Sequence, residues 1–368
     1  TLKREARHHF VRCANKKGGI YMGGNTQMVG RQSLKFNKPV YIEETAAVCG
    51  PKEGDGPLAA YFDEISEDPF FGADSWEAGE SEMISRAVNI CLNKAMLRPD
   101  DIRYVFAGDL LGQLIATTFG IKDYGIPLFG LYGACSTCGE ALSLGAMTVA
   151  AGYADKVLTV TSSHYGSAEK QFRFPLEYAN QRPLSTTWTV TGCGAFVLTD
   201  ATSNTRRVRI TAITTGRIKD YGIKDSLNMG ACMAPAAADL IFENLKDFNI
   251  KPTYYDKIIT GDLGMVGKDI LIDLLKKNNI DIEKQHMDCG IEIFNNLEQD
   301  THSGGSGCGC SAITMAGYIM NMFRAGAVRR ILFIPTGALL STVSYNEGQN
   351  IPGIAHGIVM ELEEDQDN

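Results

Sequence analysis

The sequence predicts an α/β protein built from two similar halves. The first observation is a repeated segment: PDDIRYVFAGDLLG at Pro99–Gly112 is matched by PTYYDKIITGDLGM at Pro252–Met265, and both read as an apolar strand followed by Gly-Asp-Leu. A second similarity follows each copy, where Cys135 matches Cys310 in a strand-turn-helix pattern. Third, strand and helix patterns alternate along the chain, which is typical of parallel sheets with helices on their faces.

The first half is expected over residues 33–203. A run of residues that favour β-structure predicts its first strand, and apolar residues at helical spacing predict the next helix. Gly-Ala-Cys-Ser-Thr after an apolar run predicts a strand that turns into a helix of small residues. Residues 165–188 are rich in aromatic residues, Pro and Arg, have no counterpart in the second half, and are interpreted as an insertion. The expected strands are Pro39–Val48, Arg103–Ala107, Ile126–Tyr132 (buried), Lys156–Thr161 and Thr189–Thr199, and the helices are Trp76–Leu97 and Thr137–Ala151.

The second half is expected over residues 206–364. It opens with a strand at Val208–Thr215, and Ala-Pro then begins a helix at Ala234–Leu245. The repeated segment follows, and Ile354–Leu362 is the last expected strand before an acidic tail.

Composition excludes several classes of protein. The 368 residues are 44% hydrophobic and 21% charged, which is typical of a globular protein with a large core. The net charge of −8 argues against a nucleic-acid partner. Ten cysteines scattered in apolar segments indicate reduced thiols in a cytosol-like compartment. The close pairs Cys135/Cys138 and Cys308/Cys310 are interpreted as small residues at helix starts, since no His cluster completes a metal site.

No run of about 18 mostly apolar residues is present, so no membrane-spanning helix is expected and membrane association would go through partners. Residues 1–27 are basic and lack a clear period. They are expected to be a disordered extension outside the fold.

Cys135 is the sharpest candidate for chemistry. It follows a strand and a Gly and begins a helix, where unpaired amides and the helix dipole stabilise a thiolate or a bound anion. The alternative is a small residue that only packs against a crossing helix, and the local pattern leaves both readings open.

Several motifs resemble the stage V sporulation protein AD family of spore-forming bacteria, which is part of the thiolase-like class of condensing enzymes. The similar segments are AGDLLGQ, GLYGACST, EKQFRFPLEY, TGDLG, GGSGCGCSA and IPGIAH, within about residues 33–362. The resemblance implies a thiolase-like duplicated fold, a five-layered α-β-α-β-α stack with two mixed, mainly parallel sheets.

The chain departs from the condensing enzymes at the partners of the nucleophile. Asp262 stands at the strand end where similar enzymes place a His. Thr301 occupies the other expected His position, with His302 one residue away, and the loop after Pro335 lacks a second Cys. A carboxylate would not polarise a carbonyl as a His does. The sequence is therefore interpreted as a binding protein descended from an enzyme, with no catalytic residue and no cofactor.

The family resemblance implies a ligand, dipicolinic acid (pyridine-2,6-dicarboxylate), free or as its calcium chelate, bound during uptake into the developing spore. Helix starts and a Gly-rich loop suit its two carboxylates, and aromatic residues near Phe172 with Arg173 or Arg182 suit its ring and charge. Asp109 and Asp262 could instead cap helices, and His164 could buttress the site. The candidate ligand-binding residues are Cys135, Ser136, Thr137, Asp109, Ser163, His164, Arg173, Asp262, His302 and Gly305.

Two other functions stay open at this point. One is a Cys-dependent acyltransferase or condensing enzyme with Cys135 as nucleophile and His302 or His164 as base; the other is a structural subunit that serves as a docking platform. The resemblance also implies a homodimer, other proteins of the same sporulation transport system as partners, and a peripheral location at the inner spore membrane. Ser136→Tyr is expected to block the site without disturbing the core.

Overall fold

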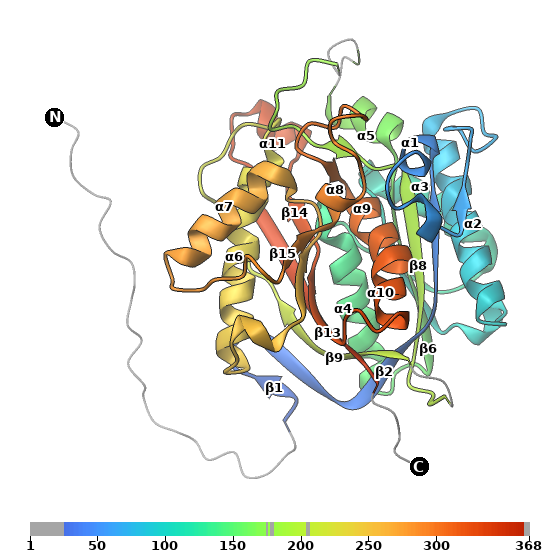
Figure 1. The fold of residues 1–368 in the computed structure, drawn as a ribbon. Helices are drawn as coiled ribbons and strands as arrows, with labels where there is room; N and C mark the ends of the chain where they lie inside the picture. The colour runs from blue at the N-terminus through green and yellow to red at the C-terminus, as the bar shows by residue number, and fades with distance from the viewer. Residues whose placement is uncertain (1–25, 174–175, 177–179, 204–206, 364–368) are drawn as a thin grey trace.

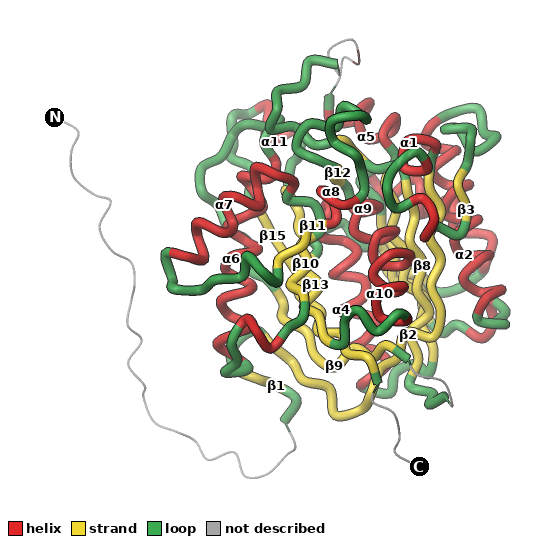
Figure 2. The backbone as a smooth tube through the Cα atoms, viewed as in Figure 1, coloured by secondary structure: helices red, strands yellow, loops and turns green. Residues whose placement is uncertain are grey.

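The computed structural model describes residues 26–173, 176, 180–203 and 207–363 (Figure 1). Nearly all of the 1–27 extension, with Phe174 and Tyr178 of the insertion, lies outside the described residues. Ten strands form one continuous hydrogen-bonded path, in the order β11-β10-β13-β15-β9-β2-β8-β6-β4-β5 (Figure 2). These strands are β2 (Ser33–Cys49), β4 (Tyr104–Gly108), β5 (Leu128–Gly130), β6 (Lys156–Ser163), β8 (Gly192–Thr199), β9 (Val208–Thr215), β10 (Lys257–Thr260), β11 (His286–Asp288), β13 (Arg330–Ile334) and β15 (Gly353–Leu362).

The two halves of the path have the same strand order and direction. In the first half, β4 pairs in parallel with β5 and β6, and β8 runs antiparallel between β6 and β2. In the second half, β10 pairs in parallel with β11 and β13, and β15 runs antiparallel between β13 and β9. In each half, therefore, a single strand opposes the others, so the expectation of mixed, mainly parallel sheets is confirmed.

The two sheets are not separate. The long strand β2 pairs antiparallel with β9 as well as with β8, and this pairing joins the halves edge to edge. β2 begins at Ser33, before the expected Pro39, and the first three added residues, Ser33, Leu34 and Lys35, pair with β9.

Helices form three layers around the sheets (Figure 1). Side chains alternate along the central strands: Val105 packs in the core beside α2 and α3, while the next residue, Phe106, packs beside α4. The main helices are α2 (Trp76–Lys94), α3 (Ile115–Ile121), α4 (Thr137–Ala150), α5 (Tyr165–Phe172), α6 (Met229–Asp247), α7 (Gly264–Lys276), α9 (Cys308–Ile313) and α10 (Met320–Arg324).

Three hydrophobic cores correspond to the three helix layers. α4 and α9 lie between the sheets, in the core that contains Leu142 and Phe333. α2 and α3 cover the outer face of the first half, and α6 and α7 cover that of the second. The five layers expected from the sequence are present.

The remaining strands and α-helices are short. They are strands β1 (Met28–Val29), β3 (Glu64–Ile65), β7 (Trp188–Thr189), β12 (Gly305–Ser306) and β14 (Thr336–Ala338), and helices α1 (Pro51–Gly54), α8 (Cys289–Glu292) and α11 (Thr342–Asn346). β7 pairs with β12, so the insertion of the first half contacts the Gly-rich loop of the second half, residues 304–309.

One strand differs from its prediction. The segment Ile126–Tyr132 was expected to be a buried strand, but β5 lies at the end of the path and Leu128 and Phe129 are 41% and 51% exposed. An apolar run predicts a buried strand, but it does not show whether the strand has a neighbour on both edges. In this chain one edge of β5 has no neighbour among the described strands.

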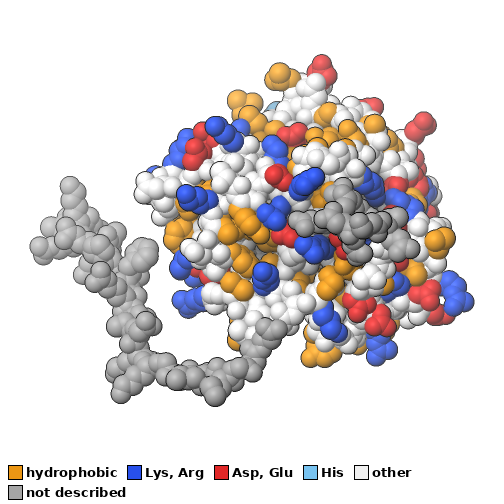
Figure 3. Space-filling model, turned by 60° about the horizontal axis from the view of Figure 1, so that its bottom comes forward, with side chains coloured by type: hydrophobic (Ala, Val, Ile, Leu, Met, Phe, Trp, Pro, Cys, Tyr) orange, Lys and Arg blue, Asp and Glu red, His pale blue; other side chains and the backbone are white. Residues whose placement is uncertain are grey.

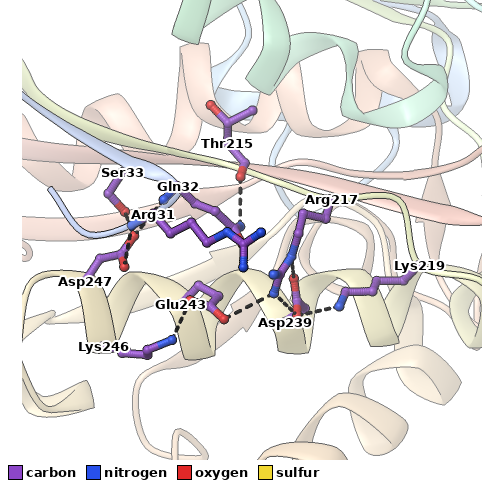
Figure 4. Close-up of polar contacts among 10 residues, drawn as sticks. All are labelled: Arg31, Gln32, Ser33, Thr215, Arg217, Lys219, Asp239, Glu243, Lys246 and Asp247. Atoms are coloured by element: carbon purple, nitrogen blue, oxygen red, sulfur yellow. Dashed lines mark hydrogen bonds and ion pairs between the residues drawn. The ribbon is translucent and has the colours of Figure 1, made fainter. Parts of the chain in front are cut away.

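Acidic side chains on α6 bind both the start of β2 and the segment that follows β9 (Figure 4). Asp247 accepts hydrogen bonds from the backbone amides of Arg31 and Gln32 and from the Ser33 hydroxyl. Glu243 and Asp239 lie one and two helical turns before Asp247, and both pair with Arg217, which follows β9. Spacing of four residues places the three carboxylates on one face of the helix.

Among the described residues, the structure contains no helix that is long and apolar enough to cross a membrane.

Candidate functional site

Cys135 lies at the start of α4, beside a cavity of about 470 Å³. The turn before it places Ala134 in the left-handed region, with φ of 53°, which is uncommon for a residue with a Cβ. Cys135 itself is 7% exposed. The predicted strand-turn-helix at Cys135 is therefore confirmed in position.

The cavity lies where the two halves meet. Cys135 and α5 of the first half line it together with Ser306, Gly307 and the segment after β14 of the second half. Its walls are mainly apolar, with a few polar side chains, as in many small-molecule sites. The lining residues are Leu110, Gly112, Tyr132, Ala134, Cys135, Ala168, Glu169, Gln171, Phe172, Arg173, Thr189, Met229, Ser306, Gly307, Ala338, Leu339, Leu340, Ser341 and Thr342.

The partner of the Cys135 thiol is a carboxyl group. The Cys135 thiol lies beside the carboxyl group of Asp262, which follows β10 and accepts hydrogen bonds from the Gly307 amide (3.0 Å) and the Thr336 hydroxyl (2.8 Å). Burial, and then the Asp262 carboxylate, raise the pKa of the Cys135 thiol well above its usual value. Burial raises the pKa of Asp262 to about 7. The pair thus keeps the sulfur protonated, the opposite of what a nucleophile needs.

Among the described residues, no histidine lines the cavity. His302 contacts the Pro183 carbonyl through Nδ1 and Asp300 through Nε2. His164 caps α5, its Nδ1 accepting from the Gly166 amide. Neither stands beside the sulfur as a general base would.

Several predicted ligand-binding residues form hydrogen bonds with backbone groups instead. Ser136 donates to the Gly133 carbonyl at 2.7 Å and Thr137 to the Ala134 carbonyl at 2.6 Å, so both hydroxyls stabilise the turn and neither residue lines the cavity. Asp109 is buried and accepts from the Leu111 amide and from the Thr117 amide and hydroxyl. This is the capping role that the sequence left as an alternative.

Ser163 and Gly305 also lie outside the cavity lining. The Ser163 hydroxyl donates to the Val190 carbonyl at 2.7 Å and accepts from the Gly309 amide. Gly305 is buried in β12, packed near Val190. Both residues position the Gly-rich loop, whose next residues, Ser306 and Gly307, do reach the cavity.

Arg173 is the predicted cation that the structure brings to the cavity. Its Nε lies 3.3 Å from Glu169 Oε2, while its Nη1 is buried and has no hydrogen-bond partner among the described residues. Arg182 instead pairs with Asp300 at 2.6 Å. Glu169 was missed from the sequence, although its position one turn before Arg173 on a helix was a usable signal.

A buried carboxyl, Glu80 of α2, underlies the site. It is 1% exposed and accepts from the hydroxyls of Ser162 (2.8 Å) and Ser167 (2.7 Å). Burial, and then nearby Asp109, raise its pKa to about 8. Because the carboxyl stays neutral in the folded protein while it ionises in the unfolded chain, stability from this group falls as pH rises from about 4.5 to 8.

We expect Glu80→Gln to flatten this part of the pH dependence, since a neutral amide cannot ionise and the serine hydroxyls can rotate to match it. The difference in the free energy of unfolding between pH 5 and pH 8 should change by about 1–3 kcal/mol, measured by urea denaturation. Glu82→Gln, at a half-exposed carboxyl on the same helix, is the control. Equal pH slopes for wild type and Glu80→Gln would contradict this account.

No group of three or more His, Cys, Asp or Glu side chains in the described part of the chain is arranged to hold a metal ion.

Comparison with known proteins gives both family and fold. The sequence profile described as stage V sporulation protein AD matches residues 30–361. Stage V sporulation protein AD of Bacillus subtilis (strain 168) is 40% identical over 335 residues, which cover 91% of this chain and 98% of the relative.

Solved condensing-enzyme structures share the fold at low sequence identity. They include 3-oxoacyl-[acyl-carrier-protein] synthase III from Aquifex aeolicus VF5 (15% identity, TM-score 0.52, 88% of this chain and 99% of that one). An OleA variant from Xanthomonas campestris aligns with 12% identity and a TM-score of 0.56, over 89% of this chain and 99% of that one. The expected thiolase-like fold is confirmed.

Proposed function

The chain belongs to the stage V sporulation protein AD family, and on that premise we propose that the cavity beside Cys135 binds dipicolinic acid without converting it. In this proposal the protein holds the ligand during its uptake into the developing spore. It works at the inner spore membrane as a peripheral protein, together with other proteins of the same transport system.

The pairing of Cys135 with Asp262 is the observation that supports binding without catalysis. A condensing enzyme needs a thiolate and a group that polarises a carbonyl. Here burial and a carboxylate disfavour the thiolate, and none of the described histidines lines the cavity. The same cavity remains available for a small ligand because Cys135 is a small, polarisable side chain.

The lining suits a small aromatic dicarboxylate. The free Arg173 Nη1 can donate to one carboxylate, and a guanidinium binds a carboxylate through two nitrogens when geometry allows. Phe172 and Tyr132 supply aromatic surface for the ring. The cavity volume of about 470 Å³ lies within the usual range for small-molecule sites.

The charges of the site favour the calcium chelate over the free dianion. Arg173 and Glu169 are the charged residues of the cavity lining and face each other, so the lining has no excess of positive charge. The chelate of a dianion with Ca²⁺ is neutral. The buried Glu169 Oε2 is ion-paired with Arg173 Nε at 3.3 Å but forms no hydrogen bond with a described residue, and a carboxylate oxygen is the kind of ligand that calcium accepts.

Calorimetric titration of dipicolinate, with and without calcium, and of acetyl-coenzyme A into the same sample tests this function. The proposal predicts binding of dipicolinate, tighter with calcium, and no acylation of Cys135. Cys135→Ala should bind within about tenfold of wild type, since it removes one contact worth on the order of 1 kcal/mol. Thioester turnover that is lost in Cys135→Ala would establish the acyltransferase alternative instead.

A variant that fills the cavity tests whether the ligand binds there. Gly112 lines the cavity, and a Cβ built there meets only Gln171 Oε1, at 3.8 Å. Gly112→Tyr should therefore fill the cavity and abolish dipicolinate binding while the fold stays intact. Unchanged affinity in this variant would move the ligand elsewhere.

We also propose a homodimer formed through the exposed edge of β5. Phe129 is 51% exposed on this edge strand, with Tyr132 (56%) and Phe119 (53%) also exposed nearby in the chain. Apolar strand edges readily pair with another chain. Sedimentation at micromolar concentration should show a dimer, and Phe129→Lys should shift it to monomer; a wild-type monomer would refute the proposal.

A further inference from the structure

A second cavity, of about 490 Å³, lies at the opposite ends of the strands from Cys135. Cys135 and Asp262 sit beyond the carboxyl ends of the parallel strands, whereas this groove includes Arg330, the first residue of β13. Figure 3 shows the face that comes forward when the lower end of Figure 1 is turned toward the viewer, where Lys and Arg side chains lie beside hydrophobic ones. We name it the junction groove, because β2 and β9, the strands that join the halves, form its floor.

A break in the pairing of these two strands opens the groove. Lys35 pairs with Ala212 and Val40 with Ile210, so four residues of β2 stand opposite the single residue Thr211. The extra residues bulge away from β9, as bulges do when one strand is longer than its partner. The bulge carries Phe36 and Lys38 to the rim.

Four cations line the junction groove against one carboxylate. Glu361 pairs with both Arg209 (3.3 Å) and Arg330 (2.8 Å). Lys35 and Lys38 are exposed and form no ion pair with a described residue. In addition, Arg209 Nε is buried with no hydrogen-bond partner among the described residues. This local excess of positive charge stands on a chain whose net charge is −8.

We propose that the junction groove binds a phosphate-bearing anion, carried either by an anionic lipid headgroup or by a soluble molecule. Phosphate presents several oxygens, so it can accept from Arg209 and both lysines at once, whereas a planar carboxylate offers two. Aromatic surface beside the cations, from Phe36, Phe248 and Tyr254, gives the apolar part of the ligand a place to pack. This site does not depend on the dipicolinate proposal.

The test compares two double variants of the full chain with equal net charge. Lys35→Gln/Lys38→Gln removes the rim cations, and Lys224→Gln/Lys277→Gln removes two exposed lysines elsewhere. Residues 1–27 are basic and are present in both double variants, so they contribute equally to anion binding. A difference in affinity between the variants is therefore due to the groove. The probes are phosphatidylglycerol vesicles, phosphatidylcholine vesicles and inorganic phosphate, measured by cosedimentation and by calorimetry.

We expect the groove variant to lose about tenfold or more in affinity, and the control less than about twofold. Binding to phosphatidylglycerol vesicles but not to inorganic phosphate assigns the site to lipid headgroups, and binding to inorganic phosphate assigns it to soluble phosphates. Arg209→Lys should also weaken binding, since it removes the buried Nε donor. Absence of binding to every anionic probe, or equal losses in the two double variants, would overturn the proposal.

Discussion

Arg173→Gln is expected to weaken dipicolinate binding about a hundredfold. Arg173 is the cation that lines the cavity, and its Nη1 has no hydrogen-bond partner in the described structure. A charge-assisted hydrogen bond of this kind contributes about 1.5–3 kcal/mol, and 1.4 kcal/mol is tenfold in affinity. Calorimetric titration of dipicolinate with calcium measures the change.

The matched control for this variant is Lys170→Gln. Lys170 lies on α5, three residues before Arg173, carries the same charge and pairs with Glu77 away from the cavity, so its loss should change the affinity by less than about twofold. Arg173→Gln also leaves Glu169 without its ion pair, and Glu169→Gln/Arg173→Gln removes that complication. Wild-type affinity in both Arg173 variants would show that the ligand does not use this cation.

Ser136→Tyr is expected to destabilise the fold by about 3–5 kcal/mol rather than only to block the site. Ser136 is fully buried, its hydroxyl holds the Gly133 carbonyl, and its backbone packs against Gly337. A phenol ring has no space there. The sequence-based expectation that this change spares the core was wrong, because the start of α4 is covered by β14 of the other half.

Urea denaturation tests this second prediction, with Gly112→Tyr as the control that adds the same ring in open space. We expect a large fall in the unfolding midpoint for Ser136→Tyr and a small change for Gly112→Tyr. A Ser136→Tyr protein as stable as wild type would contradict the packing described here.

The fold was largely predictable because it is repeated. The Gly-Asp-Leu segments at Asp109 and Asp262 mark equivalent central strands, β4 and β10. The cysteines matched in the sequence lie near the starts of the helices between the sheets, but Cys135 comes two residues before α4 whereas Cys310 is the third residue of α9. The sequence could not show that β2 and β9 join the halves, since antiparallel pairing between distant strands leaves no local signal. The sequence also could not distinguish an apolar edge strand from a buried strand, as at β5, because both appear as the same apolar run.

The site was predictable only in part. Cys135 and Arg173 line the cavity, and Asp262 lies against the sulfur, because a helix start, a cation and a strand end carry recognisable patterns. The hydroxyls of Ser136 and Thr137 instead bond to their own turn. The wall formed by residues 338–342 was missed, since its proximity to Cys135 arises from tertiary packing between the halves.

A crystal structure of the protein with dipicolinate and calcium tests the central claim most directly. The account predicts the ring in the cavity between Cys135 and Phe172, a carboxylate within hydrogen-bond distance of Arg173 Nη1, and no covalent bond to Cys135 Sγ. A ligand bound outside this cavity, a cavity left empty at saturating ligand, or a covalent adduct on the sulfur would contradict it.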